Sequence, residues 1–120
     1  MRLGPPLLFT PELEAAADFY GRVLGLQLTA RTERHLTFTT ATGVLIVFKS
    51  EQPAPASIHS EHAGSVVTFE VEALDEAMRR LKADGVRFLH SEPARNEATG
   101  LLYAAFLAPG GIIHELVQPA

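Results

Sequence analysis

Two stretches decide how this chain folds: residues 14–26 read EAAADFYGRVLGL, and residues 105–118 read AFLAPGGIIHELVQ. The first belongs to a segment from Pro11 to Leu24 whose apolar side chains recur at the three- and four-residue spacing of one helix face. Thr10 can accept a hydrogen bond from an early helical N–H, and Gly25 suits the position just after a helix. The sequence therefore predicts one helix from Pro11 to Leu24. Its predicted buried face consists of Leu13, Ala16, Ala17, Tyr20, Val23 and Leu24.

A second helix is predicted from Ala73 to Asp84, because its apolar residues again share one side and Gly85 follows it. Short runs rich in β-branched and aromatic residues surround both helices, and Gly, Pro or polar residues separate most of these runs. The predicted strands are 3–9, 26–31, 35–40, 44–49, 66–71, 86–89, 101–107 and 112–117.

The two halves of the chain have the same order of predicted elements. The helical segments and the glycines that end them, Gly25 and Gly85, repeat at an offset of about 60 residues. Each helix follows one strand and precedes two or three. We therefore expect a single domain of two β-α-β-β-β modules, about 1–50 and 66–120, joined by a connector at 51–65.

The composition excludes several classes of protein. With 120 residues, 47% of them hydrophobic, the chain suits one compact domain, and its net charge of −4 gives no basic surface for nucleic acid. The absence of cysteine excludes disulfides, thiolate nucleophiles and cysteine-based metal sites. No apolar run is long enough to span a bilayer, and residues 1–10 do not resemble a signal peptide. We expect a cytoplasmic protein with neither a nucleic-acid nor a membrane partner.

The chain resembles the vicinal oxygen chelate superfamily, through the pattern FYxxVLG at Phe19–Gly25 and the pattern PxGxxxEL at Pro109–Leu116. This superfamily includes glyoxalase I, bleomycin-resistance proteins, fosfomycin-resistance thiol transferases and extradiol dioxygenases. The resemblance covers essentially the whole chain. It implies an α+β fold in which mixed sheets of two βαβββ modules curl into a half-barrel cup, and it implies a homodimer.

Metal-dependent members of that superfamily hold a divalent metal in the cup. The resemblance places their first-strand ligand at Pro5, their second-module ligand at Val66, their fourth-strand carboxylate near Val47 and their last-strand Glu at Glu115. Of these four side chains only Glu115 can bind a metal, and such a site needs about three or four protein ligands. We therefore expect no metal or other cofactor at the family positions.

The histidines could rebuild a metal site only in part. His59 and His62 lie in the connector, where the simpler interpretation is that both are solvated. His114 adjoins Glu115 on a strand and should point to the opposite face. His90 is expected to be exposed at a strand end.

Strand alternation selects the residues of the cup. It places His35 and Thr37 on the concave side, with Leu36 and Phe38 on the side packed against the helix. Extended to the other strands, it adds Leu7, Phe9, Thr39, Val47, Lys49, Thr68, Glu70, Tyr103 and Ala105. The candidate ligand-binding residues are His35, Thr37, Val47, Thr68, Glu70, Tyr103 and Glu115.

Three functions are compatible with this pattern. The first is metal-free binding of a small organic molecule in the cup, as the resemblance to bleomycin-resistance proteins implies, with a role in antibiotic resistance. The second is a glyoxalase-like lyase, or an isomerase, thiol transferase or dioxygenase, with Glu115 as general base and with or without a metal completed by His35, His59 or His62. The third is an interaction module without a small ligand.

Overall fold

The computed structural model describes residues 1–52 and 65–119, and the chain divides into two compact units. The first unit contains the first module together with Pro109–Gly111, and the second contains the rest of the second module. His59 and His62 lie outside the described residues. No helix of the described part of the chain is long and apolar enough to cross a membrane.

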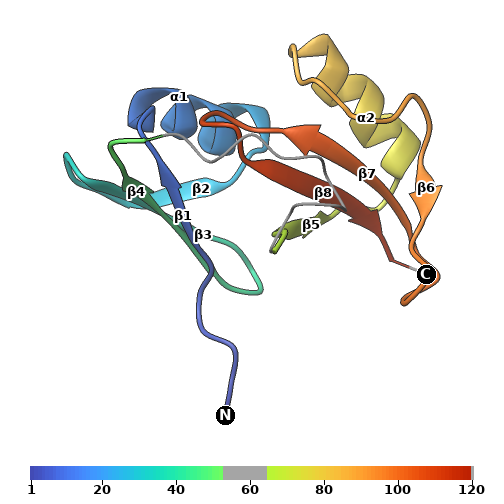
Figure 1. Ribbon diagram of the computed structural model, residues 1–120, viewed down its shortest axis with the longest axis horizontal. Helices are drawn as coiled ribbons and strands as arrows, with labels where there is room; N and C mark the ends of the chain where they lie inside the picture. Colours follow the sequence, from blue (N-terminus) through green and yellow to red (C-terminus); the bar gives the residue numbers. More distant parts are fainter. Residues whose placement is uncertain (53–64, 120) are drawn as a thin grey trace. The chain divides into compact units, whose positions relative to one another are not determined.

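The first unit has a four-stranded mixed sheet in the order β1-β4-β3-β2 (Figure 1). β1 pairs with β4 in parallel, and the other pairs are antiparallel. β1 begins at Leu7 and not at the predicted residue 3, because Pro5 and Pro6 have no N–H to donate to a neighbouring strand. The strands are β1 (Leu7–Thr10), β2 (Gln27–Arg31), β3 (His35–Thr39) and β4 (Val44–Lys49).

The predicted first helix has two parts. An α-helix, α1 (Leu13–Asp18), continues into a five-residue π-helix, η1 (Phe19–Val23), in which the Leu24 N–H donates to the Phe19 carbonyl at 2.9 Å. The predicted helical segment is therefore confirmed over Leu13–Val23, but its last five residues are π-helical, which the apolar spacing does not distinguish from an α-helix. Gly25 follows with φ of +79°, as its predicted place after the helix requires.

The core of the first unit lies between this helical segment and the sheet, where α1 contacts β3 and β4 (Figure 1). Tyr20 and Phe38 are both fully buried, and their ring centroids lie 5.8 Å apart. Burial of the Tyr20 ring raises the pKa of its phenol. The apolar residues buried here are Leu8, Leu13, Ala16, Tyr20, Val23, Leu36, Phe38, Leu45 and Val47.

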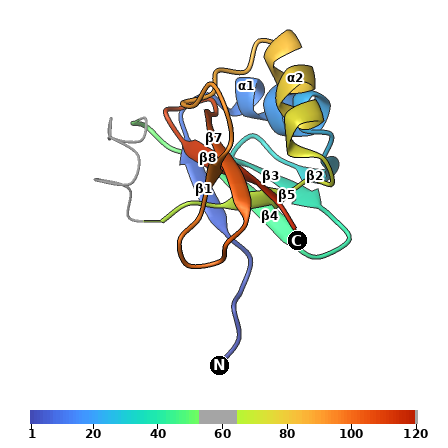
Figure 2. The same ribbon diagram turned by 90° about the vertical axis from the view of Figure 1, so that its right-hand side faces the viewer.

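The second unit repeats the arrangement, with strand order β5-β8-β7-β6 and a parallel pair of β5 and β8. The helix α2 (Leu74–Ala83) contacts β7 and β8, which run side by side in both views (Figures 1 and 2). Its buried residues are Leu74, Ala77, Met78 and Leu81. The strands are β5 (Thr68–Glu70), β6 (Ala94–Arg95), β7 (Leu102–Leu107) and β8 (Ile113–Gln118).

The predicted strand at 86–89 is wrong as a regular strand. Within 86–89 only Phe88 forms a bridge, to Phe106 of β7. The edge strand that pairs with β7 is β6, which comes later in the sequence. Pro93, which cannot donate to a ladder, directly precedes β6 and separates these two short pairings. The α+β fold with one βαβββ order in each unit is confirmed, and neither sheet closes on itself.

Candidate functional site

Each sheet has one face that packs against its helix and one that does not, which we call the helix-free face. In the first unit the strand register fixes the members of this face. Phe48 pairs with Phe9 on one side and His35 on the other, and Ile46 pairs with Leu7 and Thr37. Paired residues point to the same side of a sheet. The helix-free face therefore contains Leu7, Phe9, His35, Thr37, Ile46 and Phe48.

Three rings form a continuous cluster on this face. Phe9 stacks on Phe48 with ring centroids 5.6 Å apart and planes 20° apart, and His35 lies 5.6 Å from the same Phe48 ring. Phe9 is 54% exposed although it lies within a strand. The Nδ1 atom of His35 is buried and has no hydrogen-bond partner among residues 1–52 and 65–119. The cluster thus combines apolar ring area with one unsatisfied polar atom.

The predicted position of Val47 on the concave side is wrong. Val47 pairs with Leu36 and is completely buried on the helix side, and Lys49, which pairs with the buried Thr10, shares that side. The residue that faces away from the helix is Ile46. All residues from Val44 to Phe48 are apolar, so this strand carries no alternation from which its two faces could be told apart.

The second unit brings the remaining predicted residues onto its own helix-free face. Thr68 pairs with Glu115, which pairs in turn with Ala105 of β7. Val117 likewise pairs with Glu70 of β5 on one side and with Tyr103 of β7 on the other. Thr68, Glu70, Tyr103 and Glu115 therefore share one face as predicted, with Glu115 and Tyr103 half-buried.

His90 is half-buried, not exposed as the sequence suggested. Its ring packs edge-on against Tyr103 with centroids 5.5 Å apart, and its Nε2 atom is buried without a hydrogen-bond partner among the described residues. His90 lies in the irregular segment that follows the Phe88 bridge, so strand alternation could not place it. The structure thus adds a second ring with an unsatisfied nitrogen, on the same face as Glu115.

His114 lies on the opposite face from Glu115, as alternation predicts. Its side chain is completely buried between Phe69 and Phe106, and its Nδ1 lies 3.1 Å from the Val67 carbonyl oxygen. Burial lowers the pKa of His114 to about 4, against a smaller opposing effect of the Val67 contact. His114 is therefore a neutral core residue near pH 7.

The family's metal-binding positions do not fit a metal in this chain. Pro5 lies just before β1, Val66 lies just before β5, and both Val47 and Ile46 of β4 have hydrocarbon side chains. The described residues contain no group of three or more His, Asp or Glu side chains that could hold a metal ion. Glu115 alone does not provide the three or four ligands that such a site requires.

Comparisons with known proteins identify the fold and the family. Among solved structures, a lactoylglutathione lyase from Agrobacterium tumefaciens matches with a TM-score of 0.71 and 20% identity over 98% of this chain and 92% of that one. A glyoxalase/bleomycin resistance protein/dioxygenase from Nocardioides matches with a TM-score of 0.74 and 23% identity over 98% and 83%.

A glyoxalase family protein from Enterococcus faecalis gives a TM-score of 0.75 and 21% identity over 98% and 97% of the two chains. At these identities the likeness establishes the fold. A search of curated proteins gave no match. The family model described as Glyoxalase/Bleomycin resistance protein/Dioxygenase superfamily matches residues 2–116, and the chain belongs to this superfamily.

Proposed function

We propose that this protein binds a small organic molecule with a flat apolar ring, without a resident metal, on the helix-free face of its first unit. The observation that carries the proposal is the cluster of Phe9, Phe48 and His35, in which a phenylalanine in mid-strand leaves half of its surface exposed. Small-molecule sites combine such apolar area with a few polar groups that fix orientation.

The neighbouring polar atoms suit this task. The buried Nδ1 of His35 can accept or donate one hydrogen bond, depending on its tautomer, and the Thr37 hydroxyl belongs to the same face. No carboxylate belongs to the set of paired residues that defines this face. A neutral or weakly polar ring system is therefore the ligand class that this face favours.

A titration with quinones and with aromatic and glycopeptide antibiotics tests the proposal, with calorimetry as the readout. Phe48→Leu should weaken the binding of a ring compound by about tenfold, because it removes the central ring of the cluster. Phe88→Leu is the matched control, since Phe88 packs against Phe106 in the other unit and should leave affinity unchanged. Binding by no compound, or equal loss in both variants, would remove the proposal.

Catalysis by Glu115 is the second candidate function. It is favoured by the half-buried position of this carboxylate on a helix-free face, in register with Thr68 and Ala105. A carboxylate held in this way can take a proton from a carbon next to a carbonyl. Glu115→Gln should then abolish turnover of an α-hydroxycarbonyl or hemithioacetal substrate while ligand affinity remains. Turnover unchanged by this substitution would exclude Glu115 as the base.

A homodimer is the assembly we propose, on the grounds of membership in this superfamily. Light scattering at the concentrations used for the titration measures it directly. A monomer mass that persists when a ligand is bound would exclude a dimeric binding unit.

A further inference from the structure

The first unit has two surface grooves away from the ring cluster, at the place where β4 ends and α1 begins. The smaller groove has a volume of about 480 Å³ and is lined by Pro11, Arg34, Lys49, Ser50 and Glu51. A second groove of about 890 Å³ shares Pro11 and Lys49 with it. Lys49 is on the helix side of the sheet because it pairs with Thr10, so both grooves are separate from the site proposed above.

Two cations stand next to each other in the smaller groove. His35 pairs with Phe48 on antiparallel strands, so Arg34, which precedes His35, lies opposite Lys49, which follows Phe48. The Lys49 N–H donates to the Arg34 carbonyl at 2.8 Å. Both side chains are exposed, and neither forms an ion pair within the described part of the chain. Like charges opposite each other on neighbouring strands destabilise a sheet. An anion bound between the two side chains would attract both of them and so offset their mutual repulsion.

The backbone around these cations is held in place without a ligand. The Thr32 hydroxyl accepts hydrogen bonds from the N–H groups of Arg34 and His35, at 3.1 Å each, which fixes the turn that carries Arg34. On the other strand, the Ser50 N–H donates to the Thr10 carbonyl at 2.9 Å. A site whose backbone is already ordered loses less entropy on binding.

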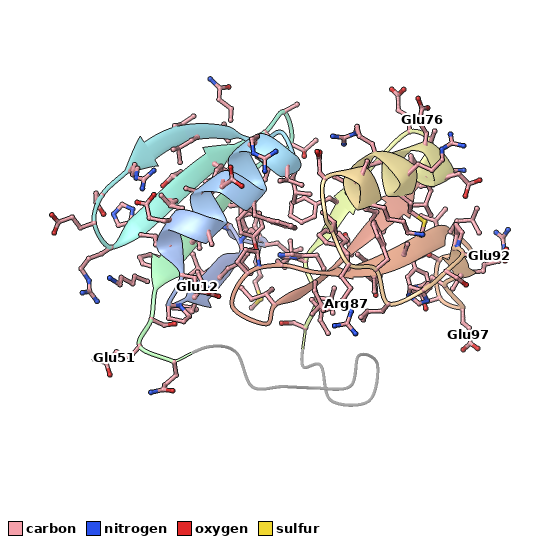
Figure 3. The ribbon with its side chains drawn as sticks, turned by 90° about the horizontal axis from the view of Figure 1, so that it is seen from above. Glu12, Glu51, Glu76, Arg87, Glu92 and Glu97 are labelled. Atoms are coloured by element: carbon pink, nitrogen blue, oxygen red, sulfur yellow. The ribbon has the colours of Figure 1, made fainter. Side chains whose placement is uncertain are left out.

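Some of the charges that line the larger groove are engaged, while the Glu33 carboxylate, which also lines it, forms no ion pair within the described residues. Arg31 pairs with Glu14, and the Glu12 carboxylate accepts a hydrogen bond from the Gly110 N–H at 3.0 Å. Figure 3 shows Glu12 at the start of α1 and Glu51 beyond the end of β4. Glu51 lines the smaller groove and opposes an anion there, while the two cations outnumber it.

We propose that Arg34 and Lys49 bind the phosphate group of a small phosphate-bearing molecule, whose remaining part extends past Lys49 into the larger groove. The Arg34 guanidinium can donate two hydrogen bonds to one phosphate, and Lys49 adds a point charge. The proposal does not depend on the ring-binding function, because it uses other residues on the other side of the sheet.

Nuclear magnetic resonance titration with inorganic phosphate, at constant ionic strength set with sodium chloride, tests this site. We expect saturable shifts of the backbone amides of Arg34, Lys49 and Ser50. Malonate is the second probe and should bind more weakly, because each of its carboxylate groups is planar and lacks the tetrahedral arrangement of the phosphate oxygens. Shifts that do not saturate, or equal affinity for malonate, would overturn the assignment.

Charge variants locate the site within the same titration. Arg34→Gln and Lys49→Gln should each weaken phosphate binding by about fivefold, whereas Glu51→Gln should strengthen it, because the carboxylate repels the anion. Arg79→Gln, on the exposed side of α2, removes the same charge elsewhere and should change nothing. Equal effects of Arg34→Gln and Arg79→Gln would show a response to net charge alone and overturn the proposal. Spectra that otherwise superpose show that each variant is folded.

Discussion

Gly110→Ala tests the packing of Gly110 against Thr10 within the first unit. Gly110 is buried, has φ of +83°, and a Cβ added to it would lie 2.9 Å from the Thr10 Cβ and closer still to the Thr10 hydroxyl. The positive φ costs an alanine about 1–2 kcal/mol, and forcing extra volume into a packed contact costs about 1–3 kcal/mol. The free energy of unfolding should therefore fall by about 2–5 kcal/mol.

Gly25→Ala is the matched control, because Gly25 has a similar φ of +79° but no atom within 4 Å of an added Cβ. It should lose only the backbone cost of about 1–2 kcal/mol. Urea denaturation followed by circular dichroism measures both variants under one set of conditions. If Gly110→Ala were no less stable than Gly25→Ala, the close packing of Gly110 on Thr10 would not hold in solution.

Three further predictions concern the core and the surface. The free energy of unfolding should decrease by up to about 3 kcal/mol as the pH falls from 6.5 to 4, because the unfolded chain binds a proton at His114 that the folded chain excludes. Urea titrations at several pH values measure this decrease, and His114→Phe should make it smaller. Phe38→Ala should cost about 3–5 kcal/mol in the same assay, as the ring is completely buried, and a loss below 1 kcal/mol would contradict its place in the core. Arg22→Gln should leave the midpoint of thermal denaturation almost unchanged, since its pair with Asp18 is exposed, and a clear decrease of that midpoint would contradict this.

The sequence predicts most of the fold because the signals that decide it are local. The recurring apolar residues of α2 and the glycines at 25 and 85, both with positive φ, place the helices and their ends. The π-helical turn at Phe19–Val23 is not predictable in this way, because the spacing of apolar residues does not distinguish an α-helical from a π-helical winding over five residues. The single bridge between Phe88 and Phe106 and the pairing of β6 with β7 are long-range contacts, so the local sequence pattern at 86–89 could not distinguish them from a regular strand.

The candidate site is predictable only where strands alternate between polar and apolar residues. In β3, the pattern of His35 to Thr39 gives the correct face for each residue, and the same holds for Thr68 and Glu70 in β5. β4 is apolar from Val44 to Phe48, so its face is fixed only by its register with β1 and β3. Phe48, at the centre of the ring cluster, could not have been selected from the sequence for this reason.

The error at Val47 leaves the chemical basis of the proposed function unchanged. A shift of one residue in a strand exchanges all the side chains that face a site, so it could have exposed a metal ligand that the sequence interpretation had missed. Here the shift replaces Val47 by Ile46, and neither side chain has an atom that binds a metal. The same shift brings Phe48 beside Phe9 and His35. The corrected assignment therefore removes no metal-binding atom from this face, moves the Lys49 side chain off it and adds ring area to it, which favours a flat apolar ligand.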